Sequence, residues 1–154
     1  MSTKLRNATS QWLSDDEERA WRAFRRMTVS VHVNIARDLA KTGLSEPDYE
    51  VLSTLVERSD STNTLHSQAA KMGWSKSRLS RHATRMEARG LIARAPDPAD
   101  GRGCLLILTK TGRDVLRAAT PVHLNSVRHR FADLLDDGEL ETLTRVAEKL
   151  TKTE

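Results

Sequence analysis

The chain is poor in the residues that crosslink small secreted proteins. Its 154 residues include one cysteine, Cys104, which excludes an intrachain disulfide and a cysteine-based zinc site and fits a reducing cytoplasm. Aromatic residues make up only 4%, so Leu, Val, Ala and Met must form most of the core. Apolar runs such as LLIL (105–108) are far shorter than the ~20 residues that span a bilayer. The N-terminal MSTKLRNATSQW lacks the apolar segment of a signal peptide. We therefore expect a cytoplasmic protein without membrane contact.

Charge, in contrast, is plentiful. Charged residues make up 30% of the chain, and the formal net charge is +4. A mildly basic balance favours a polyanionic partner only weakly, so the location of the charge carries more information. The length suits one domain, or one compact domain with a dimerisation arm.

Apolar spacing and start signals predict a mainly helical chain. A first long helix is expected between the capping box of Ser14 and Glu17 and the terminating Gly43. Two short strands, 91–95 and 104–109, flank a turn-rich loop at 96–103, and 59–63 is predicted to be a polar loop. The remaining helices are expected over 45–58, 64–72, 75–89, 110–135 with a kink at Pro121, and from Asp136 to 150.

The helix predicted over 75–89 has a face of one charge sign. A rotation of about 100° per residue puts Leu79, Ala83 and Met86 on a buried stripe, with His82 at its edge. Ser75 is placed to cap the helix. No acid occurs from 75 to 86, whereas a merely solvated helix normally mixes both signs. The exposed side therefore points to nucleic acid; it carries Ser77, Arg81 and Arg85, flanked by Ser80, Thr84 and Arg78.

The surrounding elements strengthen this interpretation. A short helix, a turn through Gly73 and the basic helix form a helix-turn-helix, whose second helix enters the DNA major groove. Arginine suits guanine there because two of its donors match O6 and N7. The hairpin places Arg102 near its tip, where it can contact the minor groove or phosphates. Together these elements predict a winged helix-turn-helix.

The motifs WSKSRLSRHATRMEARGLIAR, DPADGRG and LTKTG resemble those of the MarR family of bacterial transcription regulators, and LSEPDYEVLSTL resembles the family's preceding helix. The resemblance covers about 12–150 and is strongest from 73 to 114. It implies a homodimer joined by its terminal helices, bound to a pseudo-palindromic operator. Most members are repressors, often released by a small phenolic or other anionic ligand. DNA contact is carried over to Ser75, Lys76, Ser77, Arg78, Ser80, Arg81 and Arg102, and Arg85 is added from the helix face.

The expected organisation follows from this resemblance. Residues 44–114 are predicted to form the winged helix-turn-helix lobe, and 12–43 with 115–154 a helical dimerisation region. Residues 1–11 are expected to be a flexible tail. The wing's Asp100 is expected to brace Arg102. Gln68 departs from the family pattern, because an apolar residue usually stands there, and Cys104 is more simply a small strand residue than a redox sensor.

Other functions have less support in the sequence. Trp21, His32 and Tyr49 could line an effector pocket, although ordinary packing or surface positions explain each of them more simply. The five histidines form no HExxH pair, so no catalytic residue, metal site or cofactor is predicted. The alternative is a winged-helix module for protein contacts or RNA, without operator specificity.

Overall fold

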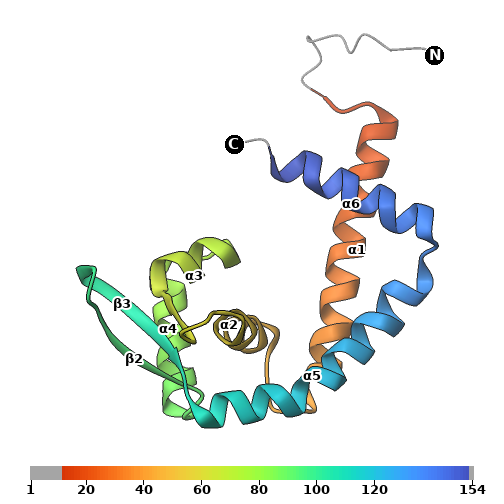
Figure 1. Cartoon of the computed structure of the whole chain (residues 1–154). Helices are drawn as coiled ribbons and strands as arrows, with labels where there is room; N and C mark the ends of the chain where they lie inside the picture. Colours follow the sequence, from red (N-terminus) through yellow and green to blue (C-terminus); the bar gives the residue numbers. More distant parts are fainter. Residues whose placement is uncertain (1–11, 153–154) are drawn as a thin grey trace.

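A computed structural model of the chain describes residues 12–152, so the tail predicted at 1–11 lies outside the described residues. The elements run α1 (Asp15–Ala40), α2 (Glu46–Glu57), β1 (Thr62–Thr64), α3 (Leu65–Met72), α4 (Lys76–Ala88), β2 (Ile92–Asp97), β3 (Asp100–Leu108), α5 (Lys110–Arg130), a 3-10 turn (Ala132–Leu134) and α6 (Asp137–Thr151). Figure 1 shows α2, α3, α4 and the β2–β3 hairpin gathered on one side, which we call the lobe. The long α1, the end of α5 and α6 lie on the other side, which we call the arm.

The helix starts follow the local sequence closely. The Ser14 side chain accepts from the Glu17 amide, and the Glu17 carboxylate accepts from the Ser14 amide, as the capping box predicts. Ser45 and Asp48 form the same reciprocal pair at α2. The helix ends are less well predicted. Helix α1 stops at Ala40, before Gly43, and α5 stops at Arg130 instead of 135. Pro121 lies inside α5, and Figure 1 shows that helix bending along its length.

The sheet has one strand more than the sequence predicted. Its order is β1-β3-β2, with both pairings antiparallel. The predicted polar loop at 59–63 is only partly a loop, because Thr62–Thr64 pairs with Leu105–Ile107 of β3. Ser61 makes the turn into this strand with a left-handed φ of 56°. A strand of three residues is too short to show alternation, so its pairing depends on the exposed edge of β3.

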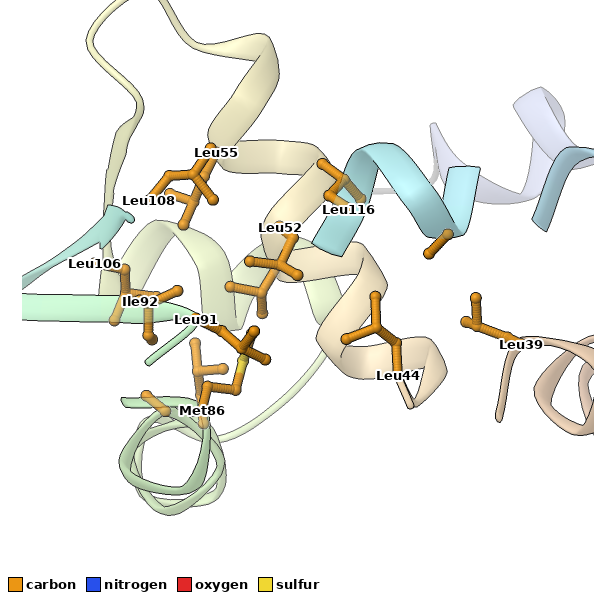
Figure 2. Close-up of a cluster of buried hydrophobic side chains, with 14 of the residues drawn as sticks. Leu39, Leu44, Leu52, Leu55, Met86, Leu91, Ile92, Leu106, Leu108 and Leu116 are labelled. Atoms are coloured by element: carbon orange, nitrogen blue, oxygen red, sulfur yellow. The ribbon is translucent and has the colours of Figure 1, made fainter. Parts of the chain in front are cut away.

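One apolar cluster holds the lobe together (Figure 2). Leu79, Ala83 and Met86 of α4 are fully or almost fully buried, which confirms the predicted stripe. They pack with leucines of α2 and β3, and Leu39 and Leu44 extend the cluster toward α1. Gln68 is also fully buried, and its Oε1 accepts a hydrogen bond from Asn63 Nδ2 at 3.0 Å. This hydrogen bond satisfies the carbonyl oxygen of the buried amide, whereas Gln68 Nε2 has no hydrogen-bond partner among the described residues.

The arm is much less buried within one chain. Helix α1 has only Ile35 and Leu39 buried, both toward its C-terminal end, and α6 has no buried residue. Asp38 joins α1 to α5 by accepting from Ser126 Oγ at 2.8 Å and Arg130 Nε at 3.3 Å. No helix within residues 12–152 is long and apolar enough to cross a membrane.

Candidate nucleic-acid interface

Helix α4 presents its polar face to solvent. Ser75 caps the helix by accepting from the Arg78 amide at 3.2 Å, and Gly73 ends α3 with a left-handed φ of 64°. This tight turn sets α4 against α3 in a helix-turn-helix. The first acid of the helix is Glu87, in its last turn. The side chains on the exposed face are those of Lys76, Ser77, Arg78, Arg81, Thr84 and Arg85, with Ser80 half-buried beside them.

A concave surface joins α4 to the hairpin. A cavity of about 540 Å³ is lined by Lys76, Ser77, Ser80 and Arg81 of α4 and by Arg94, Arg102 and Cys104 of the hairpin. Among residues 12–152, no carboxylate lies within ion-pair distance of Lys76, Arg81 or Arg102. These three cations are therefore available to an external anion. A DNA duplex supplies phosphates and base-edge acceptors, which are the groups that such cations recognise.

The wing is braced through its main chain. Asp100 Oδ1 accepts from the Arg102 amide at 3.1 Å, so Asp100 supports Arg102 at the backbone and leaves the guanidinium exposed. Asp97 Oδ1 accepts from the Ala99 amide at 2.9 Å in the same turn. A Cβ at Gly103 would lie 3.0 Å from Asp97 Cβ, so glycine allows this close approach of the two strands. The tip of the hairpin is thereby held while its arginine side chain extends outward.

Three of the predicted contact residues lie outside this cavity: Ser75, Arg78 and Arg85. The Arg78 guanidinium stacks 3.7 Å above the centre of the Trp74 ring. Arg85 Nη2 lies 3.2 Å from His82 Nδ1, and Arg85 lines a separate pocket with Asp48 and Arg89. Neither Arg78 nor Arg85 lines the cavity with the wing. The cavity thus brings together Lys76, Ser77, Ser80, Arg81 and Arg102, whereas Ser75 lies at the helix start.

Arg94 lines the cavity and was not expected there. Its amide and guanidinium both donate to the Glu87 carboxylate, at 3.1 Å each. This contact ties β2 to the end of α4, so Arg94 joins the recognition helix to the wing. One feature of the sequence could have indicated this contact: Arg94 is a charged residue in an otherwise apolar strand, and it follows Glu87 by seven residues.

A second pocket lies where α1, α2 and α5 meet. His32 and Tyr49 line this cavity of about 430 Å³ together with Trp74 and His123. The His123 ring stacks on Tyr49 with 4.1 Å between ring centres. Burial lowers the pKa of His123, although the Glu46 carboxylate opposes this shift. Among the described residues, the buried Nδ1 of His123 has no hydrogen-bond partner.

The structure does not bring Trp21 to this pocket. Trp21 is 53% exposed and stacks on Phe24 of the same helix, with 5.9 Å between ring centres. It precedes His32 by eleven residues, which is about three turns or ~16 Å along α1. Within one chain Trp21 therefore lies apart from the pocket of His32 and Tyr49, on the exposed apolar face of the arm.

Comparisons with known proteins agree with this geometry. The model of the MarR family matches residues 44–104, the part of the chain from α2 to the hairpin. The structure of AbsC, a MarR family transcriptional regulator from Streptomyces coelicolor, is 34% identical and superposes with a TM-score of 0.87, covering 93% of this chain and 97% of AbsC. The chain belongs to the MarR family. MarR family proteins are DNA-binding transcriptional regulators and not enzymes, so the enzyme classes are excluded on family grounds.

Two further relatives align with most of this chain. Transcriptional regulator HosA from Escherichia coli O111:H- is 32% identical over 107 residues, which is 70% of this chain and 77% of HosA. Sco3205, a MarR family regulator from Streptomyces coelicolor whose structure is in complex with DNA, is 27% identical with a TM-score of 0.88. That match covers 95% of this chain and 92% of Sco3205. Both the lobe and the arm therefore have counterparts in solved MarR structures.

Proposed function

We propose that the protein is a dimeric repressor that binds a specific pseudo-palindromic operator and is released by a small phenolic or other anionic ligand. In this proposal residues 44–114 form the DNA-binding lobe, and 12–43 with 115–154 form the dimerisation region. The protein acts in the cytoplasm. The single observation that supports it most is the cavity between α4 and the wing, with its three cations outside ion-pair distance of any described carboxylate.

Recognition of the DNA base sequence is assigned to the exposed face of α4. Ser77 and Arg81 lie one turn apart on that face, where α4 would meet base edges in the major groove. Arg102 on the hairpin would contact the minor groove or phosphates beside it. The likeness to Sco3205, which is solved with DNA, supports this docking. Ser75, Lys76, Arg78, Ser80 and Arg85 complete the proposed contact set, with Ser75 offering phosphate the amides of the helix start.

Dimerisation is assigned to the arm. Trp21 and Phe24 of α1 are 53% and 45% exposed, and Val146 of α6 is 41% exposed. Large apolar side chains on long, sparsely buried helices are typical of an interface that a second copy covers. A two-fold dimer would present two α4 helices to successive major grooves, which requires a pseudo-palindromic operator.

The effector site is assigned to the pocket of His32, Tyr49 and His123. Tyr49 offers an aromatic face, and the buried His123 Nδ1 offers one unused hydrogen-bonding atom. The pocket lies between arm and lobe, so a ligand there could change how the two α4 helices are spaced.

The alternative is a winged-helix module that contacts protein or RNA without operator specificity. Selection of duplexes from a random pool, followed by footprinting of the selected sequence, separates the two. The repressor proposal predicts a pseudo-palindromic site and a dimer by light scattering. Equal binding to all duplexes and to RNA, or a monomer in solution, contradicts it.

A further inference from the structure

A carboxylate lies buried directly beneath the recognition helix. Asp48, at the start of α2, is only 2% exposed. Its Oδ2 accepts from the Ser45 amide at 2.9 Å and from Arg89 Nη1 at 2.8 Å, and its Oδ1 lies 2.9 Å from His82 Nε2. Burial raises the pKa of Asp48, but the contacts with His82, Arg89 and Ser45 outweigh it and hold the pKa well below its ordinary value. Asp48 is therefore a buried anion with two hydrogen-bond donors on Oδ2, while its Oδ1 lies close to His82 Nε2 without a hydrogen bond of good geometry. A helix cap alone requires only the contact with Ser45.

The neighbouring atoms determine the protonation of His82. Arg85 Nη2 lies 3.2 Å from His82 Nδ1, and a guanidinium can only donate hydrogen bonds. Nδ1 must therefore be the accepting nitrogen, and the ring hydrogen must be on Nε2, the nitrogen that lies 2.9 Å from Asp48 Oδ1, although the two atoms do not complete a hydrogen bond. A carboxylate this close to Nε2 favours the tautomer with its hydrogen on Nε2, which is the tautomer that can accept from Arg85. His82 itself is only 8% exposed, so this relay connects a buried carboxylate to a cation on the helix surface.

A second attachment lies two turns further along α4. Arg89 Nη2 donates to the Gly43 carbonyl at 2.6 Å while Nη1 binds Asp48. The end of α4 is thereby tied both to α2 and to the turn between α1 and α2. His82 and Arg89 are seven residues apart and so lie on the same face of α4. Two anchors on one face oppose both rotation and tilt of the helix.

We propose that Asp48 and His82 are positioning residues for DNA recognition: they orient α4 and direct Arg85 toward the duplex. This inference rests on the proposed function, because it assigns Arg85 to the DNA contact. It also explains a buried charge in the lobe, where an apolar side chain of similar size would pack at no desolvation cost. Arg81 lines the cavity with the wing and makes no hydrogen bond to His82, so it is outside the relay.

The substitution Asp48→Asn tests the relay with almost no change in shape. Because Ser45 and Arg89 both donate to Oδ2, the amide oxygen must stay there and the NH₂ group must face His82. His82 Nε2 then has to accept, and its hydrogen moves to Nδ1, which can no longer accept from Arg85. Imidazole ¹⁵N shifts should report Nε2–H in the wild type and Nδ1–H in the variant. Affinity for the selected duplex should fall by about fivefold.

A double-mutant cycle distinguishes positioning from general destabilisation. The loss caused by Asp48→Asn should disappear in an Arg85→Ala background and persist in an Arg81→Ala background. Asp38→Asn is the matched control, because it neutralises another hydrogen-bonded carboxylate that has no contact with α4. If Asp48→Asn does not fold, His82→Gln gives the same test, because its amide can donate to Asp48 but offers Arg85 no acceptor at the Nδ1 position.

The results distinguish failure of the positioning role from failure of the proposed repressor function. An Nδ1–H tautomer in the wild type, or an equal affinity loss in all backgrounds, overturns the positioning role and leaves the proposed repressor function standing. A wild-type chain that selects no duplex overturns the repressor and, with it, the positioning role.

Discussion

At the residue scale, Arg81 is the side chain that most directly tests base reading. It lies on the exposed face of α4 and lines the cavity shared with the wing. We expect Arg81→Ala to cost about 1–3 kcal/mol of binding free energy and to relax the preference at one base pair. Arg102→Ala should weaken binding with less change in preference. Titration of the selected duplex and its single-base variants measures both effects. An equal loss on every duplex would reduce Arg81 to a phosphate contact.

Asp38 provides a pH-dependent prediction on the arm. A hydrogen bond from Ser126, followed by one from Arg130, lowers the pKa of Asp38 to about 2. Because the folded pKa lies below the ordinary value, this contribution to stability is complete above about pH 4 and is lost as the pH falls toward 2. Asp38→Asn should therefore flatten the loss of stability between these pH values, as followed by urea unfolding. Ser126→Ala should remove part of the same slope, and unchanged slopes in both variants would contradict the assignment.

Single residues also show why the site was only partly predictable. Helical periodicity suffices to put Ser77 and Arg81 on one exposed face, because that geometry is local. Arg85 contacts His82, which in turn lies against Asp48 of another helix. Sequence spacing contains no such information. The same limit applies to Arg94, whose place in the cavity follows from its contact with Glu87.

At the element scale, Gly112 controls how α5 joins the lobe. A Cβ at this position would lie 2.0 Å from the Leu91 carbonyl oxygen, closer than any real contact. Gly112→Ala should therefore force the start of α5 away from the turn between α4 and β2 and cost about 2–4 kcal/mol of unfolding free energy. Chemical denaturation measures this loss. Gly101→Ala is the matched control, since nothing lies within 4 Å of its added Cβ, and equal losses in both variants would contradict the steric explanation.

Elements differed in how well the sequence predicted them. All the predicted helices exist, because caps such as Ser14, Ser75 and Asp136 act within one turn. The ends of α1 and α5 were missed by a few residues, since tertiary contacts decide where a helix stops. Strand β1 was missed because its pairing partner lies some 40 residues away in the sequence. Local signals thus predicted the helices, and long-range pairing had to come from the structure.

At the scale of the whole molecule, the two halves differ in how they are held together. The lobe has a contiguous core of its own, whereas much of α1 and all of α6 expose apolar side chains in the single chain. An assembly that covers the arm would leave the basic cavity free, because the cavity is formed only by lobe residues. Figure 1 shows the β2–β3 hairpin and α4 on the opposite side of the molecule from α6 and most of α1, which agrees with simultaneous dimerisation and DNA binding.

Trp21→Glu tests this arrangement. A charge in place of a half-exposed indole should weaken the dimer by about 2–4 kcal/mol, as is typical of an aromatic residue at the centre of an interface. Light scattering should then show monomers at concentrations where the wild type is dimeric. The free energy of operator binding should fall by more than the free energy of unfolding of the lobe. A monomer binds each half-site separately, whereas a dimer binds both half-sites as one molecule. Val56→Glu, at an exposed apolar residue of the lobe, should leave the dimer intact. A monomeric Trp21→Glu chain that binds the full operator with wild-type affinity would show that pairing through the arm is unnecessary for recognition.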